Sequence, residues 1–88
     1  KMVRLFINAG KKSKIRAKDI VGAIANEAGI PGKTPGEIAI FDEYTFVDVP
    51  NEFVRDILHG MKHAKIKGKR VHIEIAKKEK TYGKKRKK

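Results

Sequence analysis

The chain has 88 residues, which is enough for one core of two packed layers and leaves little volume for a deep catalytic cleft. It contains no cysteine, so a disulfide framework and a thiolate metal site are excluded, and we expect a cytoplasmic protein. The net charge of +12 favours a polyanionic partner, and the sequence predicts neither a membrane span nor a signal peptide.

The first half of the chain predicts a strand, a helix and a hairpin. In residues 3–8 (VRLFIN), alternation places Val3, Leu5 and Ile7 on one side, which is typical of a half-buried strand. Residues 17–29 repeat apolar side chains at helical spacing, and Gly29 occupies the position of a C-terminal cap. Residues 37–42 and 44–49 then predict the two strands of a tight hairpin.

The second half predicts a helix and a last strand. Pro50 closes the hairpin, and Asn51 is expected to cap the second helix, which should end near Lys62. The apolar stripe of this helix consists of Phe53, Val54, Ile57, Leu58 and Met61. Residues 70–76 (RVHIEIA) alternate again, and the side chains expected to face inward are Val71, Ile73 and Ile75.

The order of elements is βαββαβ, which predicts an α+β domain of the ferredoxin-like type that RNA-recognition motifs share. In its usual form, four antiparallel strands in the order 4-1-3-2 carry two helices on one face. We expect residues 1–76 to form this RRM-like domain and residues 77–88 to form a basic, flexible tail. Many unrelated domains have this fold, so the fold alone indicates no function.

Positive charge is concentrated in two segments of the expected domain. Residues 11–18 and 62–70 each carry a net charge of +5. The first segment leaves strand one and the second enters strand four, so the antiparallel order predicts that they meet at one rim of the sheet. The candidate phosphate-binding side chains are Lys11, Lys12, Lys14, Arg16, Lys18, Lys65, Lys67, Lys69 and Arg70.

Aromatic side chains follow the third predicted strand at alternate positions. Tyr44 and Phe46 match the stacking positions of the RNA-recognition consensus, and Phe6 on the first strand is expected beside them. However, Asp42 and Glu43 stand where that consensus has a basic residue and a glycine. These rings could stack on bases, or they could be covered by the tail or by another domain.

The sequence contains no complete motif for nucleotide binding, metal binding or catalysis. GKKS at residues 10–13 resembles the end of a phosphate-binding loop, but Leu5 stands where its first glycine is required. His59 and His63 are four residues apart without a glutamate in the register of a zinc protease. We therefore predict no catalytic residue and no metal site.

Three stretches of the sequence are distinctive: IRAKDIVGAIANEAGI, GEIAIFDEYTFVDVP and KIKGKRVHIEIA. Through them, residues 3 to about 76 closely resemble the C-terminal RNA-binding domain of bacterial DEAD-box RNA helicases, the DbpA-like domain. The resemblance implies a divergent RNA-recognition motif that tethers an ATP-dependent helicase core to structured RNA. In several members this RNA is a hairpin of large-subunit ribosomal RNA, which implies a role in ribosome biogenesis. Other members are cold-shock or general RNA-remodelling helicases. It also implies that the loop after strand one and KIKGKR contact RNA.

The helicase motifs that bind ATP are absent from this sequence, so we expect an excised domain that binds RNA and does not unwind it. The domain should need no cofactor, with ATP and Mg²⁺ held by the helicase core of the parent protein. A homodimer, if the parent forms one, is expected to use other parts of that protein. No membrane partner is expected.

Two hypotheses follow. In the leading one, rim lysines hold phosphates and an aromatic or helix-end contact reads an unpaired base. The acidic residues 42 and 43 would then discourage single strands from crossing the sheet and favour a folded RNA held at the rim. In the rival hypothesis, the rings of Phe6, Tyr44 and Phe46 dock a protein partner or form a dimer, and the lysines only keep the protein soluble.

Overall fold

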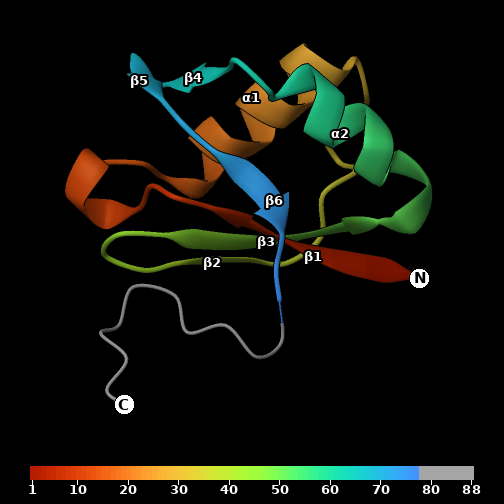
Figure 1. The fold of residues 1–88 in the computed structure, drawn as a ribbon, viewed down its shortest axis with the longest axis horizontal. Coiled ribbons are helices and arrows are strands. Elements are labelled where there is room, and N and C mark those ends of the chain that lie inside the picture. Colours follow the sequence, from red (N-terminus) through yellow and green to blue (C-terminus); the bar gives the residue numbers. More distant parts are fainter. Residues whose placement is uncertain (78–88) are drawn as a thin grey trace.

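The computed structural model describes residues 1–77, so the predicted basic tail lies outside the described residues apart from Lys77. Four strands form one antiparallel sheet, and two helices cover one of its faces (Figure 1). The order in the sheet is β2 (Ile38–Ile40), β3 (Thr45–Pro50), β1 (Met2–Ile7) and β6 (Ile73–Ile75). The predicted α+β fold and the strand order 4-1-3-2 are therefore confirmed, with β6 as the fourth strand of the motif.

The two helices are α1 (Ala17–Ala28) and α2 (Val54–Gly60). At the start of α1, the backbone N–H of Arg16 donates to the Asp19 carboxylate at 2.9 Å. Gly29 ends this helix with φ 68°, which confirms the predicted glycine cap. Glycine adopts this left-handed conformation readily because it has no Cβ atom. None of the helices in the described part of the chain is long and apolar enough to cross a membrane.

The expected cap of the second helix is wrong. Asn51 opens a short 3-10 turn, η2 (Asn51–Phe53), which precedes α2, and no side-chain capping bond is made there. Instead, the backbone N–H of Asn51 donates to the carbonyl of Lys1 at 2.8 Å. This bond ties the start of the β3–α2 connection to Lys1.

The core lies between the sheet and the two helices. Leu5 and Val47 from the central strands and Ile24 from α1 have no exposed surface, as predicted from their periodicity. Burying one such side chain contributes roughly 1.5–3 kcal/mol. Ile75 was predicted to face inward and is 45% exposed, because it ends an edge strand that pairs with β1 alone.

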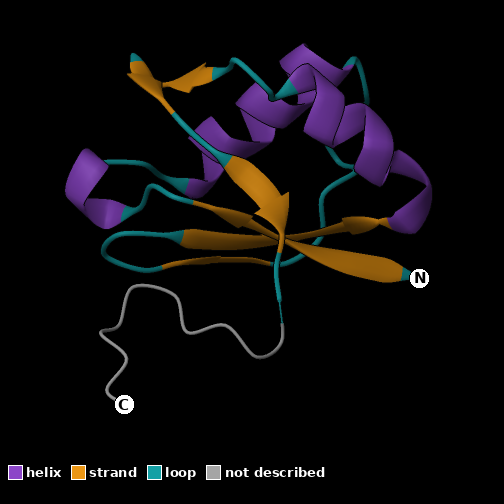
Figure 2. Cartoon of the chain, in the orientation of Figure 1, coloured by secondary structure: helices purple, strands orange, loops and turns teal. Residues whose placement is uncertain are grey.

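A second, two-stranded ribbon was not predicted. Residues 62–70 were expected to form a loop, but β4 (Lys65–Ile66) and β5 (Lys69–Arg70) pair antiparallel, apart from the main sheet (Figure 2). Lys67 and Gly68 turn the chain with φ 55° and 77°, the left-handed values that a two-residue hairpin turn requires. Ile66 is 2% exposed and joins the core, so the ribbon is anchored to the domain.

Candidate nucleic-acid interface

The ends of β1 and β6 meet at one rim of the sheet. The backbone N–H of Asn8 donates to the carbonyl of His72 at 3.1 Å, and the N–H of His72 donates to the side-chain oxygen of Asn8 at 2.7 Å. The chain that leaves β1 and the chain that enters β6 therefore pass through neighbouring points. The sheet thus brings together the two cationic segments of the sequence, as the strand order predicted.

The first cationic segment forms a basic loop, residues 10–16, which contains the 3-10 turn η1 (Lys11–Ser13). Lys14 follows this turn in a left-handed conformation with φ 61°. Ile15 is 3% exposed and anchors the loop in the core. Because the backbone is fixed in this way, the loop presents its exposed cationic side chains on a preformed support.

A hollow of about 280 Å³ lies between α1 and the ribbon, residues 65–70, and we call it the ribbon hollow. Lys18 lines it from α1, and Lys65 and Lys67 line it from the ribbon. Asp19 and Glu27 line it as well, so the hollow is cationic only by a small excess. A helix and a ribbon that are distant in sequence therefore contribute to one surface.

A second hollow of about 240 Å³ borders the basic loop, and we call it the loop hollow. Lys12 lines it from the loop and Lys69 lines it from the ribbon. Asp42 and Glu43, from the connection between β2 and β3, complete its border. Two cations and two carboxylates thus meet at this hollow, and the carboxylates are those that depart from the RNA-recognition consensus.

All the predicted phosphate-binding cations are exposed, and they divide between the hollows and the open rim. Those that line neither hollow are Lys11, Lys14, Arg16 and Arg70. The guanidinium of Arg70 lies 3.3 Å from Nδ1 of His63. That these side chains contact RNA stays a prediction.

Lys12 is the one predicted cation whose side chain is engaged with a carboxylate in the ion pairs of the described residues. Its ammonium lies 3.0 Å from Oε2 of Glu43. The hydrogen bond and the charge of Glu43 raise the pKa of Lys12. Both side chains are more than half exposed, so the pair contributes little to the stability of the fold.

The predicted aromatic side chains form one cluster, with Phe6 on β1, Phe46 on β3 and Tyr44 directly before β3. Phe6 and Phe46 are direct partners across the two strands, and Tyr44 lies 5.4 Å from Phe46 between ring centres. Sequence reasoning missed Phe41, which is 42% exposed and stacks on Tyr44 with ring centres 4.8 Å apart. The signal was available, because Phe41 and Tyr44 flank a two-residue turn and such closing positions face each other.

Arg4 is a further polar residue beside this cluster that sequence reasoning missed. Its guanidinium lies 5.7 Å from the ring centre of Phe46, within the range of a cation–π contact. The same group donates to both carboxylate oxygens of Asp48, at 2.9 and 3.3 Å, and this bond raises the pKa of Arg4. The negative charge of Asp48 is therefore matched locally.

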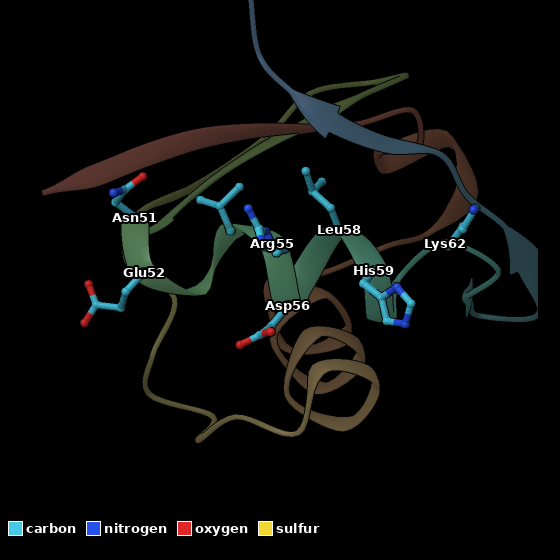
Figure 3. A pocket seen from close by; sticks show the side chains of 8 residues that line it. Asn51, Glu52, Arg55, Asp56, Leu58, His59 and Lys62 are labelled. Carbon is cyan, nitrogen blue, oxygen red and sulfur yellow. The ribbon is translucent and has the colours of Figure 1, made fainter.

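A further hollow of about 890 Å³ lies along α2, and none of the predicted phosphate-binding cations lines it (Figure 3). Glu52 and Asp56 are on one side of the helix ribbon, while Leu58 and Lys62 point to the other side (Figure 3). Arg55 also lines it, so its carboxylates and its permanent cations balance. Such a surface has no net attraction for a polyanion.

No group of three potential metal ligands occurs in the part of the chain that the structure describes. The histidines of that part are dispersed. His63 is beside Arg70, and His72 lies 3.3 Å from Glu74. The groups that line the rim are lysine and arginine side chains, the carboxylates of Asp42 and Glu43, backbone amides and aromatic rings.

Comparison with known proteins gives a consistent result. Residues 4–75 match the family model described as the DbpA RNA binding domain. The chain is 38% identical over 77 residues to the ATP-dependent RNA helicase DbpA of Bacillus subtilis (strain 168), covering 88% of this chain and 16% of that protein. It is 32% identical over 76 residues to the ATP-dependent RNA helicase DbpA of Escherichia coli (strain K12), covering 86% of this chain and 17% of that protein.

A third relative carries a different helicase name. The chain is 34% identical over 76 residues to the ATP-dependent RNA helicase DeaD of Buchnera aphidicola subsp. Schizaphis graminum. The match covers 86% of this chain and 13% of that protein. The chain thus spans less than a fifth of the length of these relatives.

Proposed function

This chain belongs to the DbpA RNA-binding domain family, and from that premise we propose that it tethers an ATP-dependent RNA helicase to structured RNA. The domain contributes RNA affinity and no catalytic residue. The helicase core elsewhere in the parent protein binds ATP and Mg²⁺ and performs the unwinding. The preferred RNA is a ribosomal RNA hairpin, which gives the parent protein a role in ribosome biogenesis or cold-shock adaptation in the cytoplasm.

The observation that carries this proposal is the convergence of the two cationic segments at one rim. Lys18 meets Lys65 and Lys67 at the ribbon hollow, and Lys12 meets Lys69 at the loop hollow. Cations from both segments can therefore contact phosphates of one folded RNA. If about six of them do so, the logarithm of affinity should fall with the logarithm of salt concentration at a slope of about −4 to −5.

Phe41 supports an additional contact to an unpaired base. Its carbonyl accepts a hydrogen bond from the backbone N–H of Lys11 at 2.8 Å, so this exposed ring lies where the basic loop meets the aromatic cluster. Stacking of one base on such a ring contributes about 1–3 kcal/mol. In this arrangement phosphates position the RNA, and one base adds a contact at the edge of the cluster.

The test compares two triple variants of the whole chain. K11Q/K65Q/K69Q removes three rim cations, and K1Q/K33Q/R55Q removes three exposed cations elsewhere. Binding to an RNA hairpin is measured against salt concentration. The rim variant should lose at least about tenfold in affinity near physiological salt, and its salt slope should be smaller by roughly two to three, because three phosphate contacts are gone.

The control variant carries the same net charge as the rim variant, but its cations lie outside the rim and are screened by salt, so its affinity should remain within about threefold of that of the unmodified chain. An equal loss in both variants would reject the rim as the RNA site. Light scattering distinguishes the rival function. A dimer that binds no RNA would support a protein-interaction module built on the aromatic cluster.

A further inference from the structure

The connection between β2 and β3 is built against the basic loop. We call this connection, residues 41–44 (FDEY), the acidic turn. The backbone N–H of Lys11 donates to the carbonyl of Phe41 at 2.8 Å, and the N–H of Lys12 donates to the carbonyl of Asp42 at 2.9 Å. The acidic turn and the basic loop are therefore joined by backbone bonds that need no carboxylate.

The backbone of the acidic turn lies so close to Gly10 that no side chain fits between them. A Cβ atom added to Gly10 would overlap the carbonyl oxygen of Phe41 and would lie 2.9 Å from the backbone nitrogen of Tyr44. Thr45, which follows the turn, is buried and donates its hydroxyl to the carbonyl of Ala9 at 2.7 Å. The position of the turn is thus fixed without the side chains of Asp42 and Glu43.

These two carboxylates also contribute little to stability. Both residues are exposed, and Glu43 is 61% exposed at its side chain even in its pair with Lys12. Exposed ion pairs stabilise proteins weakly, because water and salt screen them. A stabilising role therefore does not explain two negative charges beside the basic loop.

Their position suggests another role. Asp42 and Glu43 border the loop hollow together with Lys12 and Lys69. The residues on either side of them, Phe41 and Tyr44, stack on each other in the aromatic cluster. A phosphate backbone that runs from the basic loop over the acidic turn onto Phe41 and Tyr44 therefore passes these carboxylates at short range.

We infer that Asp42 and Glu43 are specificity-determining residues that make the domain discriminate against single-stranded RNA. The inference rests on the proposed RNA-binding function. An unpaired strand gains affinity by stacking successive bases on aromatic rings, which carries its phosphates across the acidic turn. A base-paired stem keeps its bases stacked on each other and contacts proteins through phosphates and sugars, so it can remain at the rim.

The test changes these two charges and compares two RNA probes of equal length, a hairpin and an oligouridine. D42N/E43Q removes both negative charges with almost no change in shape and leaves the backbone bonds of the turn in place. E52Q/D56N is the matched control, because it removes the same two types of carboxylate from exposed positions in η2 and α2. Thermal unfolding of each variant checks that the fold is kept.

D42N/E43Q should bind oligouridine about fivefold more tightly, because two short-range repulsions are removed. Its affinity for the hairpin should change by less than about twofold, so the preference for the hairpin narrows. The control should change the affinity for both probes by one small, common factor. The single variant D42N, which keeps the Lys12–Glu43 pair, should narrow the preference by a smaller amount.

If the ratio of the affinities for the hairpin and for oligouridine were the same in D42N/E43Q as in the unmodified chain, the inference would be overturned. The proposed RNA-binding function would be unaffected by that result. An equal narrowing in E52Q/D56N would also overturn it, because the effect would then reflect net charge alone. If the unmodified chain bound the hairpin no better than K11Q/K65Q/K69Q does, the proposed function would fail, and the inference would fail with it.

Discussion

The ammonium of Lys12 lies 3.0 Å from the carboxylate of Glu43, a residue 31 positions further along the chain. This pair joins the basic loop to the acidic turn and raises the pKa of Lys12 above its ordinary value of 10.5. The contribution of the pair to stability is present below the ordinary lysine pKa. It is lost as the pH rises through the raised value, where the ammonium loses its proton.

We therefore expect the titration midpoint of Lys12 to fall when its partner is neutralised. In E43Q the hydrogen bond is weaker and the charge of the partner is gone, so the ammonium should lose its proton at lower pH than in the unmodified chain. The ¹³C shift of the Lys12 Cε atom, followed against pH, measures this midpoint. E52Q is the control and should leave it unchanged, and identical midpoints in E43Q and the unmodified chain would contradict the pairing.

Gly10 provides a test of the close approach between the basic loop and the acidic turn. G10A places a Cβ against the backbone of Phe41 and Tyr44, which must shift to accommodate it. We expect a loss of about 2 kcal/mol in the free energy of unfolding and a fall of roughly 10 °C in Tm. Urea and thermal unfolding followed by circular dichroism measure both quantities.

G22A is the matched control for this substitution. Gly22 lies inside α1, and an added Cβ would meet nothing within 4 Å. Alanine in a helix interior is favoured over glycine, so this variant should gain about 0.5–1 kcal/mol. If G10A were as stable as G22A, the two backbones would have more freedom at this contact than the structure indicates.

The sequence predicts the main sheet well because its signals are local and strong. Alternation placed Leu5 and Val47 inside, and the βαββαβ order of elements then indicated the usual strand order of the ferredoxin-like fold. The rim followed from that order. The ribbon was missed because Lys67 adopts a left-handed conformation, whereas the usual sequence signal for such a turn is asparagine or aspartate before glycine.

The details of the site depend on contacts between distant residues, which the spacing of apolar residues along the sequence does not predict. Asp42 and Glu43 were recognised as unusual, but their bonds to the basic loop arise only when β3 pairs with β1. In the same way, Arg4 and Asp48 pair because the register of β1 and β3 places them opposite each other. Long-range pairings of this kind require the register of the strands, which alternation alone leaves open.

The ribbon allows a test of whether RNA binding needs its shape as well as its charge. G68A keeps every cation, but Gly68 has φ 77°, where a side chain is strained by roughly 1–2 kcal/mol. Because each strand of the ribbon has only two residues, this strain should disorder the turn and separate Lys65 and Lys67 from Lys18. We expect the affinity for an RNA hairpin to fall by about three- to fivefold.

G29A is the matched control, because Gly29 has a similar φ of 68° and an added Cβ at either glycine would meet nothing within 4 Å. It introduces the same kind of strain at the end of α1 opposite to the basic loop. Below the melting temperature it should therefore bind the hairpin like the unmodified chain, although it is less stable. Equal RNA affinity in G68A and G29A would show that the charges act without the ribbon, since only its geometry distinguishes the two variants at the rim.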